Sequence, residues 1–75
     1  MIRIHLSRLL GERKMKIADL SRQTNINPHA LADLYYERAK AVYFDTLEKI
    51  CEALGCTLEE LIEFQPEQKQ PASQT

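Results

Sequence analysis

The 75-residue sequence lacks the features that mark membrane, secreted and disulfide-rich proteins. No stretch approaches the roughly 18 consecutive apolar residues of a membrane-spanning helix. The opening residues, MIRIHLSRLL, have neither the long apolar segment nor the small-residue cleavage site of a secretion signal. Only two cysteines are present, Cys51 and Cys56. We therefore expect a cytoplasmic protein, not bound to a membrane, whose cysteines are reduced and buried.

Residues that build active sites and metal sites are also scarce. The only glycines are Gly11 and Gly55, too few for a glycine-rich phosphate loop. No Ser–His–Asp set or pair of carboxylates falls at a plausible spacing. The C-x4-C spacing of Cys51 and Cys56 is not a usual zinc pattern, even with a histidine nearby. The sequence therefore predicts no enzyme, no metal site and no cofactor.

The net charge is only −1, which argues against a strongly basic nucleic-acid binder. The distribution of the charges changes that interpretation. Residues 1–44 contain eight Lys or Arg and four Asp or Glu, a balance of +4, whereas residues 45–75 contain two and seven, a balance of −5. This asymmetry favours one face turned toward a polyanion and another turned away from it.

Short amphipathic segments predict five helices, and hence an all-α fold. Their expected ranges are about 7–14, 16–24, 28–37, 44–54 and 58–62. The clearest start signal is Asn27 as N-cap with Pro28 at the first helical position. Thr57 and Glu60 form a capping box for the last helix. We expect one compact domain built from these helices.

The two ends of this domain are expected to differ from its middle. Residues 2–4 of the alternating MIRI pattern indicate a short strand or extended arm. Residues 62–64 are a candidate second strand that can pair with it and tie the chain ends together. Residues 66–75 contain no large apolar side chain, so we expect a disordered tail after a domain of residues 1–65.

The functional prediction comes from the turn between the second and third helices. One helix ends at Thr24, the chain turns through Asn25, Ile26 and Asn27, and the next helix begins at Pro28. Ile26 is expected to plug the core between the two helices. This is the geometry of a helix-turn-helix, whose second helix presents its N-terminal residues to base edges in the major groove.

In these segments the chain resembles the phage-repressor family of helix-turn-helix regulators (Cro/cI-like, or XRE), and especially its small stand-alone members. The resemblance is carried by MIRIHLSRLLGERKM, IADLSRQTNI, the Leu31–Leu34–Tyr35 pattern, FDTLEKICEALGC and LEELIEF. It implies a five-helix domain like that of lambda repressor. It also implies a transcriptional regulator, in the simplest case a repressor, that binds double-stranded DNA.

The residues expected at DNA lie on and around the third helix. Lys14 and Lys16 flank the start of the second helix, whose amides also favour an anion, and Arg38 and Lys40 follow the third. Phosphate contacts of this kind position such proteins, while base contacts specify the sequence. The complete candidate set is Lys14, Lys16, Ile17, Asn27, Pro28, His29, Ala32, Asp33, Tyr36, Arg38 and Lys40.

Several of these residues have a purely structural alternative. Asn27 either only caps its helix or also touches DNA, and His29 either contacts DNA or is a solvated surface histidine. Asp33 either accepts a hydrogen bond from cytosine N4 or pairs with an arginine, Arg22 or Arg38. The Tyr36 hydroxyl either contacts the DNA backbone or belongs to a partly buried aromatic.

The acidic residues of the third helix also motivate a different function. Asp33 and Glu37 are unusual on a DNA-reading helix, so the same fold as a protein-interaction module remains an alternative. A single recognition helix reads few base pairs, which favours a homodimer on a palindromic site. The expected interface is the last helix with the chain ends, at Leu58, Leu61, Ile62 and Phe64.

Overall fold

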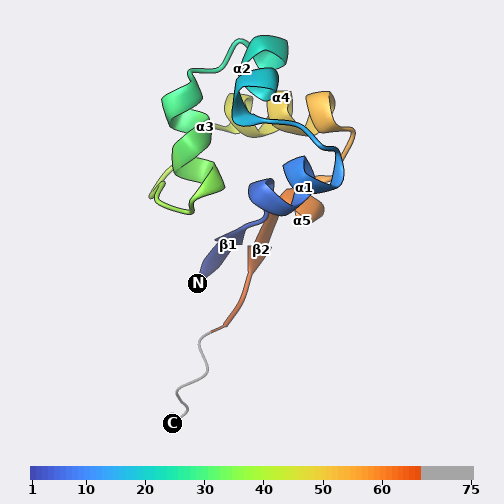
Figure 1. The fold of residues 1–75 in the computed structure, drawn as a ribbon. Helices are drawn as coiled ribbons and strands as arrows, with labels where there is room; N and C mark the ends of the chain where they lie inside the picture. Colours follow the sequence, from blue (N-terminus) through green and yellow to red (C-terminus); the bar gives the residue numbers. More distant parts are fainter. Residues whose placement is uncertain (67–75) are drawn as a thin grey trace, which may run out of the picture.

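The computed structural model describes residues 1–66, so the tail expected at 66–75 lies outside them except for its first residue. In chain order the elements are β1 (Ile2–Ile4), α1 (Leu6–Glu12), α2 (Ile17–Thr24), α3 (Pro28–Tyr35), α4 (Phe44–Leu54), α5 (Leu58–Leu61) and β2 (Ile62–Phe64) (Figure 1). The predicted five-helix fold is confirmed. None of the helices in the described part of the chain is long and apolar enough to cross a membrane.

The two short strands join the ends of the domain, as the sequence predicted. β1 and β2 pair antiparallel, with Ile2 opposite Phe64 and Ile4 opposite Ile62. Figure 1 shows the N-terminus beside β2, at the end of the molecule away from α2. Because the strands hold only three residues each, they close the domain rather than form a layer of it.

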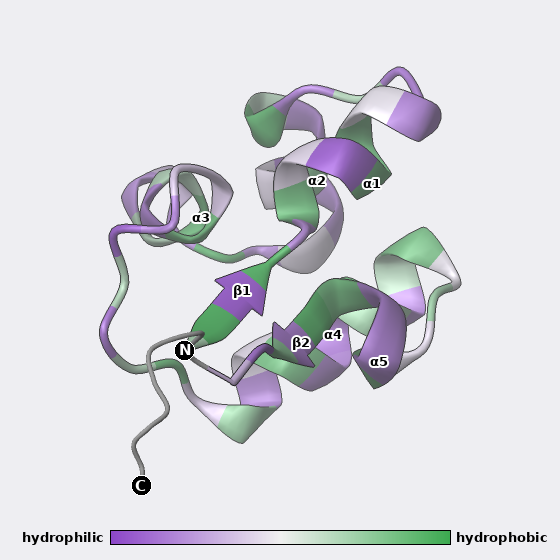
Figure 2. Ribbon diagram, turned by 90° about the horizontal axis from the view of Figure 1, so that it is seen from below, coloured by the Kyte–Doolittle hydropathy of each residue, from purple (hydrophilic) through white to green (hydrophobic). Residues whose placement is uncertain are grey.

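The core is made almost entirely of leucine. All five helices contribute, and Figure 2 shows apolar and polar residues on the same helices, as amphipathic packing requires. The buried apolar residues are Leu6, Leu9, Leu10, Leu20, Leu31, Leu34, Leu47, Ile50, Leu54 and Leu61. Ile17, Ile26, Ile4 and Ile62 pack against this core from its edge.

The first helix is shorter than the leucine pattern predicted. It begins at Leu6 and ends at Glu12, and Lys14 adopts a left-handed backbone with φ 55°. The left-handed backbone of Lys14 turns the chain at this point. Just after α1, Arg13 Nε donates to the carbonyl oxygen of Leu54 at 2.8 Å and ties this helix end to the end of α4.

Three further helix ends test the predictions made from local sequence. Asn25 and Gly55 have left-handed backbones, with φ 61° and 63°, and each ends its helix as expected. The third helix, expected to reach residue 37 or 38, instead ends at Tyr35. Of the residues expected on the apolar face of the last helix, Leu61 is 1% exposed as expected, whereas Leu58 is 53% exposed.

Candidate nucleic-acid interface

The turn between α2 and α3 is fixed by two hydroxyl groups. The Thr24 hydroxyl donates to the carbonyl oxygen of Leu20 at 2.7 Å and accepts from the Ile26 amide at 3.3 Å. The Ser21 hydroxyl donates to the carbonyl oxygen of Ile26 at 2.6 Å. Ile26 packs against the core, as predicted. The turn therefore holds α3 at a defined angle to α2, which is what a reading helix needs.

The start of α3 is capped as the sequence predicted. Asn27 Oδ1 accepts a hydrogen bond from the His29 amide at 2.7 Å, and Pro28 occupies the first helical position. The side-chain amide group of Asn27 has no partner among the described residues and is exposed. Capping therefore leaves Asn27 a donor that it can still offer to DNA.

The exposed face of α3 differs by one residue from the predicted set. His29, Asp33 and Tyr36 are exposed, but Ala32 is half-buried, whereas Ala30 is exposed. Residues three or four apart lie on one side of a helix, so Ala30 and Asp33 share a face. That spacing was a usable signal for Ala30, and the sequence analysis missed it.

Asp33 pairs with an arginine. Its Oδ1 accepts from Arg38 Nε at 3.2 Å, and Arg22 binds Asp19 instead. The Arg38 guanidinium also lies over the Tyr36 ring, 5.0 Å from its centroid. Both Asp33 and Arg38 remain about half exposed, so this pairing is weak and can rearrange when a phosphate approaches.

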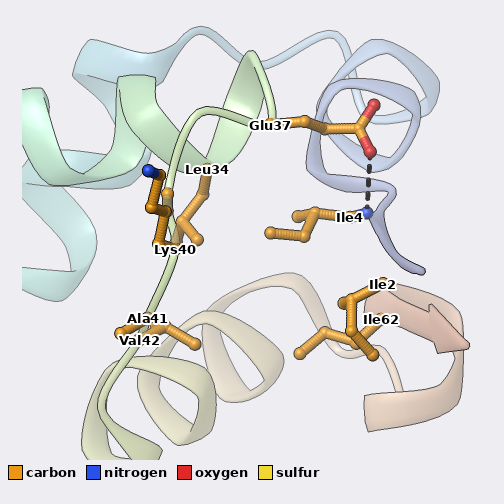
Figure 3. Close-up of a pocket in the computed structure, with 9 residues that line it drawn as sticks. Ile2, Ile4, Leu34, Glu37, Lys40, Ala41, Val42 and Ile62 are labelled. Carbon is orange, nitrogen blue, oxygen red and sulfur yellow. Dashed lines mark hydrogen bonds between the residues drawn. The ribbon is translucent and has the colours of Figure 1, made fainter.

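Glu37 does not lie on the exposed face of α3. Its left-handed backbone, φ 57°, turns the chain away after α3, and its carboxylate accepts from Arg3 Nε at 2.8 Å and Arg3 Nη2 at 2.9 Å. It also accepts from the Ile4 amide at 3.1 Å, as Figure 3 shows. The Arg3 guanidinium first, and then the Ile4 amide, lower the pKa of Glu37 to about 2. Glu37 thus ties the end of α3 to β1.

The acidic residues of the first 44 positions are all paired with arginine. The pairs are Glu12 with Arg8 and Arg13, Asp19 with Arg22, Asp33 with Arg38, and Glu37 with Arg3. Within residues 1–66, Lys14, Lys16 and Lys40 form no ion pair, and all three are exposed. The positive charge of this half of the chain is therefore available at the two ends of the helix-turn-helix.

Residues 5–67 match the family of Cro/C1-type HTH DNA-binding domains. The chain belongs to this family. The uncharacterised HTH-type transcriptional regulator YozG of Bacillus subtilis strain 168 is 34% identical over 65 residues, which span 87% of this chain and 77% of YozG. The crystal structure of a candidate DNA-binding protein from Bacteroides fragilis has the same fold, with a TM-score of 0.73 at 19% identity over 84% of this chain and 100% of that one.

Membership of the Cro/C1-type family confirms the resemblance predicted from the sequence. The chain carries a DNA-binding domain of the transcriptional-regulator type, a family that is not an enzyme class.

The start of α2 is capped by the side chain of Asp19. The Lys16 amide donates to Asp19 at 3.0 Å, and the Lys16 side chain, which has no acceptor, stays free. Ile17 packs against the core, so its side chain is partly covered.

A second exposed residue near α3 was assigned no functional role from the sequence. Tyr43, in the connector before α4, is 83% exposed. It lines a shallow pocket with Ala30, Asp33 and Thr46, which places it beside the exposed face of α3. An aromatic residue in a short connector between two helices was the available signal.

The contact between Glu37 and Arg3 predicts a pH-dependent stability. Because the folded-state pKa is below the ordinary value of 4.5, ionised Glu37 stabilises the fold above pH 4.5, and the effect disappears as pH falls through about 2. Glu37→Gln is therefore expected to lower the free energy of unfolding at neutral pH. The difference from wild type should shrink below pH 4.5 in urea titrations.

The matched control for that titration is Glu52→Gln, an exposed carboxylate on α4 that joins no ion pair in residues 1–66. Its free energy of unfolding is expected to match that of the wild type throughout the same titration. If the difference in free energy of unfolding between wild type and Glu37→Gln stayed constant down to pH 2, the charge of Glu37 would not contribute to stability.

Proposed function

We propose that this regulator binds specific sites in double-stranded DNA with α3 in the major groove. The observation that carries the proposal is the set of unpaired lysines, Lys14, Lys16 and Lys40, at the two ends of a helix-turn-helix whose carboxylates are all paired. These lysines bind phosphates on either side of the groove. Arg38 joins them when a phosphate displaces Asp33. Phosphate contacts supply most of the affinity of such proteins.

The base contacts then come from the exposed face of α3. Its N-terminal turn holds Asn27, Pro28, His29 and Ala30, and Asp33 follows about one turn later. His29 donates to a guanine acceptor or a phosphate, and Ala30 offers a methyl group to thymine. Tyr36 and the connector residue Tyr43 place hydroxyl groups at the edge of this face, within reach of the sugar–phosphate backbone.

Asp33 has two possible roles, an ion pair with Arg38 and a contact to a cytosine, and removing its charge distinguishes them. Asp33→Asn removes a carboxylate from the face turned to DNA and frees Arg38. We expect affinity for duplex DNA to rise by up to about tenfold, the effect of one added phosphate contact. Glu59→Gln, on α5, is the control and should change nothing. Loss of affinity for the preferred site alone would instead mean that Asp33 reads a cytosine.

The alternative function, a protein-interaction module that no longer reads DNA, has less support than it had from the sequence. Asp33 and Glu37 motivated it, yet both carboxylates are bound by arginines of the same chain. We therefore retain DNA recognition as the proposed function. Repression is its simplest mode, because a small domain on a promoter blocks access to it. A reporter whose output rose when the chain was expressed would contradict repression.

We further propose that the chain binds DNA as a homodimer through its ends. Of the predicted interface residues, Leu61 is 1% exposed and Ile62 packs on the core, so neither is available. Phe64 and Ile2 face each other across the strand pair and are 67% and 58% exposed. Phe64→Asp is expected to convert a dimer to a monomer in analytical sedimentation. A wild-type monomer, both free and on DNA, would refute the dimer.

The experiment that tests the proposed function is selection of bound duplexes from a random DNA pool. We expect an enriched sequence made of two inverted half-sites about one helical turn apart. Selection with no enriched sequence would mean that the domain binds DNA without reading it. No retention of any duplex at low salt would remove the proposal.

A further inference from the structure

A second surface of the molecule lies between α4 and α5 and takes no part in the proposed DNA contacts. It is a shallow groove of about 380 Å³, lined by Phe44, Leu47, Glu48, Cys51 and Leu58. Phe44 is 88% exposed, and Leu58 is 53% exposed. Large apolar side chains gathered on one exposed face commonly mark a protein interaction site.

The fold presents this groove for identifiable local reasons. Residues 44, 47, 48 and 51 follow three-and-four spacing and therefore share one side of α4. Gly55 then reverses the chain, and the Cys56 amide donates to the carbonyl oxygen of Cys51 at 3.1 Å. This tight helix end brings α5 back against α4 and sets Leu58 at the edge of the groove.

The charges around the groove favour one kind of occupant. Glu48 lines the groove, and Asp45, Glu52 and Glu59 are further exposed carboxylates on α4 and α5. None of the four joins an ion pair within residues 1–66, and Lys49 is the one basic residue on these two helices. The carboxylates of the first 44 residues, in contrast, are all paired with arginines. Helices α4 and α5 together carry five carboxylates and one lysine, so they present net negative charge beside the apolar surface. Such a surface repels DNA and a second copy of itself, and it complements a cation.

We propose that this groove docks an amphipathic segment of another protein, in which apolar side chains are flanked by Lys or Arg. The apolar residues of the segment cover the exposed side chains of Phe44 and Leu58, and its cations lie against the carboxylates of α4 and α5. In Figures 1 and 2, α3 and α5 lie on opposite sides of the domain, and no residue of α3 lines the groove. The inference therefore stands independently of the proposed DNA contacts.

The probe for this docking is a pair of short helical peptides with the same leucine face. One carries lysine on its other positions and the second carries glutamate. Each is titrated into the isotope-labelled chain and followed by amide chemical shifts. We expect the lysine peptide to shift the amides of residues 44–58 and the glutamate peptide to leave them unchanged. Equal binding of the two peptides, or shifts centred elsewhere, would overturn the proposal.

Two matched variants locate the contact. Phe44→Ser and Phe64→Ser each replace an exposed phenylalanine, so neither is expected to unfold the domain, which circular dichroism checks. Phe44→Ser should lower the affinity for the lysine peptide by about tenfold or more, whereas Phe64→Ser should bind this peptide with wild-type affinity. Equal effects of the two variants would mean that the groove is not the docking site.

The same variants distinguish a protein partner from a second copy. If Phe44→Ser, but not Phe64→Ser, converted a dimer into a monomer in sedimentation, the groove would be occupied by a second copy and the proposal would be wrong. Binding of duplex DNA by Phe44→Ser is expected to equal that of wild type. A chain that binds the lysine peptide but no DNA would contradict the proposed function and leave the docking surface intact.

Discussion

Replacing Lys14, Lys16 and Lys40 together by alanine is expected to weaken binding to duplex DNA on the order of 10²–10³-fold near 0.1 M salt. Each phosphate contact releases condensed counterions and contributes about 0.9 to the slope of log affinity against log salt. Losing three such contacts therefore reduces that slope by about 2.7. Fluorescence anisotropy with a labelled duplex over a range of salt concentrations measures both quantities.

The control for this variant is Lys49→Ala, because Lys49 is an exposed lysine on α4, away from α3. Its affinity and salt slope should match those of the wild type. The loss caused by the triple variant should be similar for different duplex sequences, since phosphates carry no sequence information. If the triple variant lost no more affinity than Lys49→Ala, the lysines would not be the phosphate contacts.

Leu31→Ala is expected to have the largest effect on stability. Leu31 is fully buried and anchors α3 to the rest of the core. Removing a buried leucine side chain costs about 2–5 kcal/mol, while a domain of this size is stabilised by roughly 3–5 kcal/mol from its core. We expect Leu31→Ala to be largely unfolded at room temperature, and urea titration followed by circular dichroism measures the change.

The matched control is the same substitution at an exposed leucine. Leu58→Ala removes a side chain that is 53% exposed, so its free energy of unfolding should stay within about 1 kcal/mol of the wild type. If the two variants unfolded at the same urea concentration, burial in the leucine core would not be what holds α3 in place.

Local signals in the sequence predicted most of the helix ends. Asn27, Pro28 and Gly55 act within one turn of their own positions, so their effect does not depend on the rest of the fold. The same holds for the Thr57–Glu60 capping box, where each side chain binds the other residue's amide. The strand pairing was also predictable, because alternating apolar residues at both chain ends have few other partners.

The features that were not predictable depend on contacts between distant residues. The local sequence predicted Glu37 to belong to a helix. In the structure its carboxylate is bound by Arg3 and by the Ile4 amide, 34 and 33 positions away. The sequence indicates no partner for Arg13, but in the structure its side chain donates to the carbonyl oxygen of Leu54. Arginine pairing was only partly predictable. The Arg3–Glu37 pair joins distant residues, whereas the sequence already suggested Arg22 or Arg38 as the partner of Asp33, and the partner is Arg38. These pairs leave Lys14, Lys16 and Lys40 as the available positive charge.

The most direct test of the account is the affinity of the purified chain for duplex DNA, measured by anisotropy from low to physiological salt. The account predicts binding that weakens steeply as salt rises, through phosphate contacts made by lysines around α3. Absence of binding to any duplex at low salt, or binding that does not depend on salt, would contradict it.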